Sequence, residues 1–176
     1  MRGGGAFAAI VLVTAAATVL HGQFKRPRAE VVPVVETTSV APGGEARLAL
    51  KVTLPPKVHV QSDKPNDPSL IPTVLTLDLP KGLSVTQTVY PKSEQLKQEG
   101  VKDLLSVFGS EFTVRILLKV ARDVAPGAVV VPGRLRYQAC DDTTCFPPAT
   151  ADAKWSLQVR RAGQQRTPAA KHDSSR

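Results

Sequence analysis

Residues 112–120 have the sequence FTVRILLKV, in which every second residue, starting from Phe112, is apolar. Phe112, Val114 and Ile116 alternate with mostly polar neighbours, as one face of a half-buried β-strand requires. The same period of two recurs at Leu48, Leu50, Val52 and Leu54, at Leu75, Leu77 and Leu79, at Leu135, Tyr137 and Ala139, and at Trp155, Leu157 and Val159. The pattern predicts a protein built from short strands that each bury one face.

Turn-forming residues separate these stretches. Proline and glycine cluster at residues 42–44, 55–56, 80–82, 126–127 and 132–133. Such clusters favour turns, and seven or more short strands joined in this way predict an antiparallel β-sandwich. No long stretch has a convincing helical period. Residues 93–105 are predicted to form a loop with at most one helical turn.

The first 22 residues have the features of a secretory signal peptide. The uncharged run at 6–20 is shorter than the roughly 20 residues that a helix needs to span a bilayer. We therefore predict a cleaved signal over 1–22, an exported, periplasmic location, and no stable membrane span in the mature chain. Residues 23–30 are predicted to be a polar leader, 31–159 the folded domain, and 160–176 a disordered basic tail.

The formal net charge of +8 is concentrated at the two ends of the chain. The predicted domain, residues 31–159, carries a net charge of only +1, with both signs interspersed. A nucleic-acid-binding domain would concentrate basic residues on one surface. The charge distribution therefore predicts no nucleic-acid partner.

The sequence contains two cysteines, Cys140 and Cys145, with four residues between them. In an oxidising compartment, cysteines this close form a disulfide. Closing a loop of about six residues stabilises a fold by only about 2 kcal/mol, against nearly 5 for a loop of about 100. The residues alone leave three interpretations open: a local structural disulfide, a redox-active pair, or a zinc site with His59 as a further ligand.

Three short segments carry a resemblance to a known family. Residues 137–148 have the sequence YQACDDTTCFPP, while 59–65 and 70–73 have the sequences HVQSDKP and LIPT. In order and separation they resemble the family of the N-terminal periplasmic domain of the thiol:disulfide interchange protein DsbD. The resemblance covers about residues 31–159. It implies an all-β, immunoglobulin-like antiparallel β-sandwich with the cysteine pair at one end, and it favours a redox-active pair.

The resemblance also implies a function. The domain would take electrons from a thioredoxin-like donor and pass them to oxidised exported thiol proteins, with no bound cofactor, in a pathway such as cytochrome c maturation. Cys145 would form the mixed disulfide and Cys140 would resolve it, as in a protein-disulfide reductase component. Residues 99–103 would form a loop that caps the pair until a partner binds.

Three departures from the family pattern affect these expectations. The best-known member has five residues between its cysteines, where this chain has four. The family's capping aromatic residue aligns near Val101, so shielding of the pair is expected from Val101 or from Phe146. The family protein continues into a membrane domain and a thioredoxin-like domain, so the electron donor is expected to act in trans.

The neighbours of the pair bear on its chemistry. Asp141 and Asp142 disfavour a thiolate nearby, so the pair is predicted to accept attack by a partner's thiolate. His59 is predicted on a strand near the cysteines, either as a surface or packing residue or as a proton carrier. Tyr137 is predicted to pack in the core or to contact a partner. The alternative function is a non-catalytic interaction module in which the disulfide is a structural clip.

Overall fold

The structure, a computed structural model, describes residues 26–161. The predicted signal peptide at 1–22 and residues 162–176 of the predicted tail lie outside the described residues. Residues 26–161 form strands and loops, and no helix among them is long and apolar enough to cross a membrane. The predicted domain bounds stay predictions; the first strand begins at Glu30 and the last ends at Val159.

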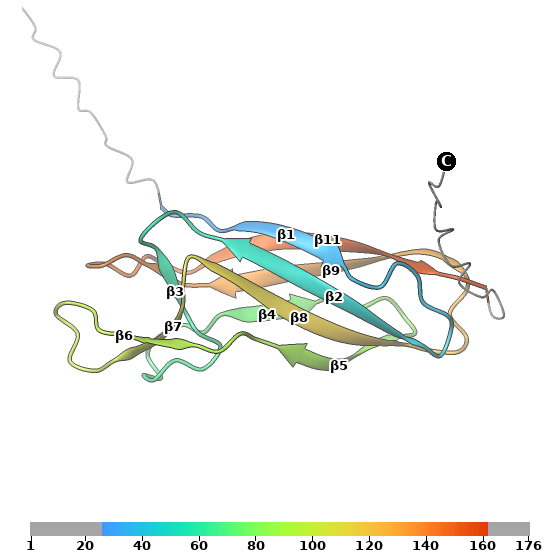
Figure 1. Cartoon of the computed structure of the whole chain (residues 1–176), viewed down its shortest axis with the longest axis horizontal. Coiled ribbons are helices and arrows are strands. Elements are labelled where there is room, and N and C mark those ends of the chain that lie inside the picture. Colours follow the sequence, from blue (N-terminus) through green and yellow to red (C-terminus); the bar gives the residue numbers. More distant parts are fainter. Residues whose placement is uncertain (1–25, 162–176) are drawn as a thin grey trace, which may run out of the picture.

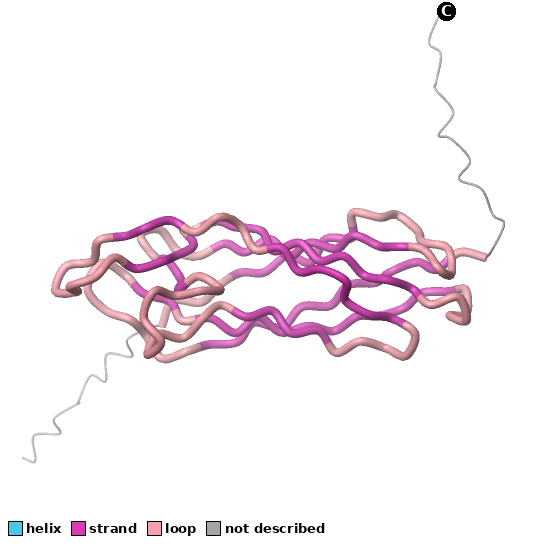
Figure 2. The backbone as a smooth tube through the Cα atoms, turned by 90° about the horizontal axis from the view of Figure 1, so that it is seen from below, coloured by secondary structure: helices cyan, strands magenta, loops and turns pink. Residues whose placement is uncertain are grey.

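Eleven β-strands make up the described part of the chain (Figure 1). They are β1 (Glu30–Val35), β2 (Glu45–Thr53), β3 (His59–Gln61), β4 (Val74–Leu77), β5 (Leu83–Val89), β6 (Glu94–Leu96), β7 (Leu105–Phe108), β8 (Glu111–Val120), β9 (Gly127–Tyr137), β10 (Ala139–Cys140) and β11 (Ala149–Val159). They form three sheets with the orders β1-β2-β8-β5, β11-β9-β4 and β10-β3-β7-β6. Neighbouring strands pair antiparallel, and Figure 2 shows the strands in two layers. The predicted all-β, immunoglobulin-like antiparallel sandwich is confirmed.

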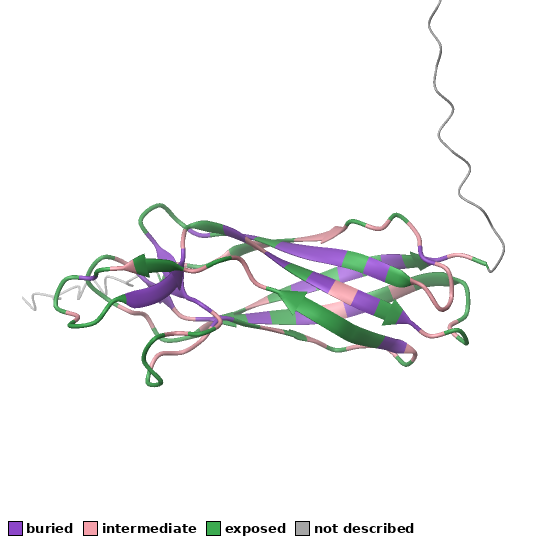
Figure 3. Cartoon of the chain, turned by 60° about the horizontal axis from the view of Figure 1, so that its bottom comes forward, coloured by how far each residue is buried: buried purple, intermediate pink, exposed green. Residues whose placement is uncertain are grey.

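The apolar alternation places one face of each long strand in the core (Figure 3). In β8, the side chains of Val114, Leu118 and Val120 have no exposed surface. From the opposite layer, Trp155 of β11 is 1% exposed, and its Nε1 donates a hydrogen bond of 2.8 Å to the carbonyl oxygen of Ala49 in β2. Because burying one large apolar side chain is worth about 1.5–3 kcal/mol, these strands supply most of the stability of the fold.

The sheet β10-β3-β7-β6, called the end sheet below, lies at one end of the sandwich, where Figure 1 shows β3, β6 and β7. The period-two pattern predicts one strand running from Leu135 into Cys140. The structure differs, because β9 ends at Tyr137 and β10 begins at Ala139, with Gln138 between them. Strand β10 pairs with β3 and not with β11. The chain thus changes sheets just before Cys140, which places this cysteine on the end sheet.

Residues 93–105 also differ from the prediction of a loop with one helical turn. They contain the strand β6, which pairs with β7 in a hairpin, and the connecting residues 97–104, called the β6–β7 loop below. A strand of three residues is too short to produce a visible alternation, so the sequence pattern did not indicate it. The hairpin brings the β6–β7 loop to the same end of the molecule as the cysteines.

Candidate functional site

A disulfide joins Cys140 and Cys145 across a tight hairpin on the end sheet. The Cα atoms of the two residues are 4.0 Å apart, and their backbones form an antiparallel bridge. The amide of Phe146 donates a hydrogen bond of 2.8 Å to the carbonyl oxygen of Ala139, one residue outside the pair on each side. The backbone hairpin therefore holds the two cysteines next to each other.

The carboxylate of Asp141 closes the turn between the cysteines. Its Oδ1 accepts hydrogen bonds from the amides of Thr143 and Thr144, at 2.9 and 2.7 Å, and from the hydroxyl of Thr143 at 3.1 Å. These backbone hydrogen bonds lower the pKa of Asp141 below its ordinary value, because they stabilise the ionised form. Asp141 is thus a fixed negative charge that caps the turn beside the disulfide.

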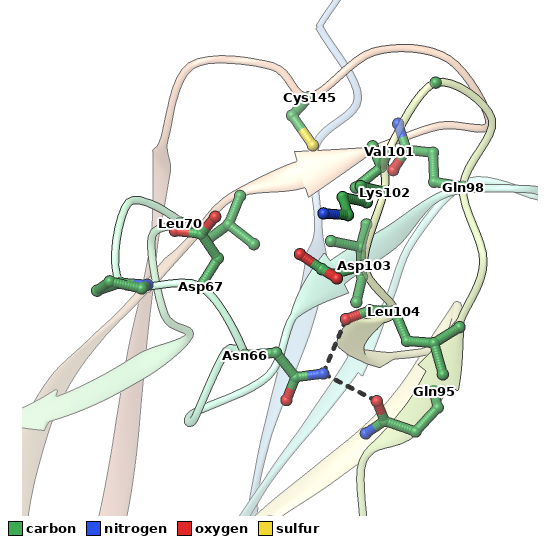
Figure 4. A pocket seen from close by; sticks show the side chains of 13 residues that line it. Asn66, Asp67, Leu70, Gln95, Gln98, Val101, Lys102, Asp103, Leu104 and Cys145 are labelled. Atoms are coloured by element: carbon green, nitrogen blue, oxygen red, sulfur yellow. Dashed lines mark hydrogen bonds between the residues drawn. The ribbon is translucent and has the colours of Figure 1, made fainter.

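The two cysteines differ in exposure. Cys140 lies on β10 and has no exposed surface, whereas Cys145 lies before β11 and is half-buried. Cys145 lines a cleft of about 940 Å³, and Figure 4 shows its side chain pointing toward that cleft. Since exchange requires a sulfur atom that an attacking thiolate can reach, Cys145 is the accessible half of the pair.

Two loops of the end sheet form the walls of the cleft. One is the β6–β7 loop, which contributes Val101 and Lys102; the other is residues 62–73, between β3 and β4. Asn66 connects the walls, because its Nδ2 donates hydrogen bonds to the carbonyl oxygen of Leu104 at 2.8 Å and to Oε1 of Gln95 at 2.9 Å (Figure 4). The cleft beside Cys145 is therefore bounded by two loops that hydrogen bonds of Asn66 hold together.

Lys97 holds the β6–β7 loop in its folded shape. Its ammonium group donates hydrogen bonds to the carbonyl oxygens of Val101 and Lys102, at 2.7 and 2.6 Å. The amide of Val101 also donates to the carbonyl oxygen of Gln98, at 3.2 Å, and Gly100 between them adopts a positive φ of 76° that glycine accommodates without strain. Lys97 thus fixes the part of the loop that lies over the cleft.

Two buried polar side chains of β3 lie beside Cys140. His59, which is 6% exposed, pairs with Cys140 in the β3–β10 ladder. Burial lowers the pKa of His59, and the negative charges of Asp142 and Asp141 offset part of that effect, so the imidazole is neutral at pH 7. Gln61 has no exposed surface, and its Nε2 donates a hydrogen bond to Sγ of Cys140 at 3.6 Å. The carboxamide of Gln61 therefore contacts the covered sulfur, and His59 is the residue opposite Cys140 on the neighbouring strand.

The other predicted site residues lie at different distances from the disulfide. Val101 lines the same cleft as Cys145, and Phe146 is half-buried directly after it. Tyr137 is 1% exposed, and its hydroxyl accepts a hydrogen bond of 2.8 Å from the amide of Ala29, so it packs in the core. The shielding and partner-binding roles of these residues stay predictions. Within residues 26–161, no three His, Cys, Asp or Glu residues are grouped to hold a metal ion.

Several residues that shape the site were not marked by the sequence pattern. Gln61 and Asn66 lie in or beside the segment 59–65, and Lys97 lies in a polar stretch without a period. All three residues of β3 are buried, so this strand does not show the polar and apolar faces that alternation detects. Gln61 directly follows the apolar Val60 in the short segment 59–61. A polar residue at such a position is the signal that could have indicated a buried polar partner for Cys140.

The family described as "Thiol:disulfide interchange protein DsbD, N-terminal" matches residues 28–156. No curated protein matches the chain. Among solved structures, the N-terminal periplasmic domain of ScsB from Proteus mirabilis is similar, with 16% sequence identity and a TM-score of 0.47. The similar region covers 74% of this chain and 46% of that one, so this chain spans less than half of that structure.

Proposed function

This chain belongs to the family of the N-terminal domain of the thiol:disulfide interchange protein DsbD, and from that premise we propose that it relays electrons through Cys140 and Cys145. It is a thiol–disulfide exchange domain. In the proposed relay, a thioredoxin-like protein reduces the disulfide, and the resulting dithiol reduces oxidised thiol proteins. The protein is exported and acts in the periplasm, where oxidised partners of this kind occur.

The proposed chemistry begins at Cys145. A thiolate of the donor attacks Sγ of Cys145, the bond to Cys140 breaks, and its electron pair stays on Cys140 as a thiolate. The second thiol of the donor then attacks the mixed disulfide and releases Cys145. The donor ends as a disulfide, and the domain has gained two electrons and two protons. The same steps in reverse pass the electrons to an oxidised acceptor.

The observation that carries this proposal is the difference in exposure between the two cysteines. Cys145 is half-buried in the wall of a cleft of about 940 Å³, while Cys140 has no exposed surface. An attacking thiolate needs access to one sulfur, and the other must leave. The cleft is large enough to receive a peptide segment of a partner. We propose that the β6–β7 loop, which contains the predicted capping residues 99–103, limits access to Cys145.

Single-cysteine variants test the proposed roles. In Cys140→Ser, the thiol of Cys145 is free and can be activated as a mixed aryl disulfide. A thioredoxin-like donor that lacks its second cysteine should then attack Cys145 and form a trapped mixed disulfide with it. With Cys145→Ser, the trapped complex should form at least about tenfold more slowly, because Cys140 is covered. The matched control is the double serine variant, which should trap none.

The same experiment separates the proposed relay from a non-catalytic interaction module. If wild-type disulfide is not reduced by a thioredoxin-like donor, and the double serine variant still binds a partner, the disulfide is a structural clip. Equal trapping by the two single variants would contradict the assignment of Cys145 as the attacked sulfur while leaving the relay itself intact. Intact mass measurement distinguishes these outcomes.

A further inference from the structure

The carboxamide of Gln61 is completely buried and makes an unusual contact. Its side chain has no exposed surface, and its Nε2 donates to Sγ of Cys140 at 3.6 Å. A disulfide sulfur has no hydrogen to donate, so the amide nitrogen is the end of the carboxamide that must face it. Within the described residues, Oε1 of Gln61 is buried without a hydrogen-bond partner. In the disulfide state, Gln61 therefore has one weak hydrogen bond and one unsatisfied acceptor.

This arrangement is unfavourable for stability. A buried polar atom without a partner destabilises a fold, and a sulfur atom in a disulfide is a weak acceptor that gives little in return. Nearby groups on the same sheet are satisfied: the hydroxyls of Ser62 and Ser106 lie 2.9 Å apart, and the hydroxyl of Thr73 donates to the backbone carbonyl of Gln61. Within the described residues, Nε2 of His59 and Oε1 of Gln98 are also buried without a hydrogen-bond partner, and Gln61 is the one of these side chains that donates a hydrogen bond to Sγ of Cys140.

Reduction of the disulfide changes what Gln61 can bind. A Cys140 thiolate is a stronger acceptor than a disulfide sulfur, because a hydrogen bond to a charged group is about twice as strong as one between neutral groups. A Cys140 thiol has a hydrogen that the carboxamide oxygen can accept. The other titratable groups next to Cys140 are His59, which is buried on β3, and Asp141 and Asp142, which lie in the turn between the cysteines. The Nε2–H of Gln61 is therefore the donor that already lies in hydrogen-bond range of Sγ on the buried side.

We propose that Gln61 is a positioning residue for thiol–disulfide exchange, which holds Cys140 as the leaving sulfur and stabilises it once the disulfide is broken. The inference rests on the proposed function, because it assumes attack at Cys145. As the donor thiolate bonds to Sγ of Cys145, the electron pair of the broken bond develops on Cys140, toward the Nε2–H of Gln61. The carboxamide stays in place while Cys140 takes up its proton from water.

The test is replacement of Gln61 by methionine, which has a similar length and volume but no strong donor or acceptor. Reduction of the disulfide by dithiothreitol should become about tenfold slower, because a hydrogen bond to the developing thiolate is lost. The equilibrium constant for reduction should fall about fivefold, which corresponds to a reduction potential about 20 mV more negative. The oxidised variant should be at least as resistant to urea as wild type, because an unsatisfied buried acceptor is removed.

A spectroscopic measurement isolates the effect on Cys140. In the Cys145→Ser background, Gln61→Met should move the ultraviolet absorbance profile of the Cys140 thiolate to higher pH, by about a tenfold change in proton concentration. Ser106→Ala is the matched control, since it removes a buried hydrogen bond from the same sheet without a contact to either sulfur. It should reduce resistance to urea and leave the thiolate profile and the rate of reduction unchanged.

The outcomes separate this inference from the proposed function. Unchanged reduction kinetics and an unchanged thiolate profile in Gln61→Met would overturn the role of Gln61, even if wild type exchanges normally. A variant that loses stability in urea, or does not fold, would also overturn it, because the side chain would then be structural. If the wild-type disulfide is not reduced by dithiothreitol or by a thioredoxin-like donor, the proposed relay itself fails.

Discussion

Replacing Lys97 by methionine should speed the reduction of the disulfide between Cys140 and Cys145. Methionine keeps most of the length of the side chain but removes the ammonium group. That group makes the two hydrogen bonds, to the carbonyl oxygens of Val101 and Lys102, that hold the β6–β7 loop in shape. The loop lines the cleft that gives access to Cys145, so loosening it should expose the attacked sulfur more often.

The magnitude follows from the two hydrogen bonds, which measure 2.7 and 2.6 Å. Hydrogen bonds to a charged group contribute about 1.5–3 kcal/mol each when buried, but Lys97 is exposed, so about 0.5–1 kcal/mol for each is appropriate. The total of about 1–2 kcal/mol corresponds to a 5–30-fold rise in the population of the open loop. If opening is fast and precedes attack, the rate of reduction rises by the same factor.

The assay is reduction of the oxidised domain by dithiothreitol, quenched with acid and followed by alkylation and intact mass. Lys92→Met is a matched control, because Lys92 is an exposed lysine in the connection between β5 and β6, outside the cleft. Its rate should equal that of wild type. An unchanged or slower rate for Lys97→Met, or an equal acceleration in the control, would refute the idea that the loop limits access.

Three further predictions concern the fold around the site. Gly133→Ala should lower the free energy of unfolding in urea by about 1–3 kcal/mol, because a Cβ there would lie 2.8 Å from the ring of Trp155. Tyr137→Phe should lower it by about 1 kcal/mol in the same assay, because the hydroxyl accepts a hydrogen bond from the amide of Ala29. Burial lowers the pKa of His59 in the folded domain. As the pH falls, His59 is therefore protonated in the unfolded chain before it is protonated in the folded domain. Stability should therefore be complete above about pH 6.5 and fall as the pH drops below it, and His59→Leu should flatten that part of the curve of urea midpoint against pH.

The body of the sandwich could be predicted from the sequence because its strands are long and half-buried. In β8, ten residues alternate between the core and solvent, and Val114 and Leu118 fall on the buried face as the period of two requires. Trp155 was predicted to lie on a strand with this alternation, and it does so in β11. Each of these strands has one buried face and one face exposed to solvent, which is the condition under which apolar and polar residues alternate in the sequence.

The end sheet could not be predicted in the same way. Its strands have two to four residues. All residues of β3 and β7 are buried, so these two strands show no alternation of buried and exposed positions. The change of sheet at Gln138 depends on contacts with distant segments: the side chain of Gln138 donates to the carbonyl oxygen of Phe146 and accepts from the amide of Ile71. Local patterns carry no information about such partners.

The candidate site was located by chemistry more than by pattern. Cys140 and Cys145 could be named from their spacing, and the disulfide between them is present. The sequence did not indicate that one sulfur is covered and the other lines a cleft. That difference arises because Cys140 is on a strand of the end sheet, whereas Cys145 is in the following loop. Exposure of this kind is a property of tertiary packing and needs the structure.

The division between the body and the end sheet has a consequence for how such a domain can evolve. Most of the core and the connection between layers through Trp155 belong to the body, whereas the disulfide, Gln61 and the β6–β7 loop belong to the end sheet. Mutations that alter exchange chemistry would therefore fall on short elements, of which only some residues, such as Val60, Phe108 and Ala139, belong to the core. A lineage can vary this end while keeping the stability that buffers new mutations. The immunoglobulin-like body thus provides a stable framework, and the specificity of exchange can diversify at the end sheet.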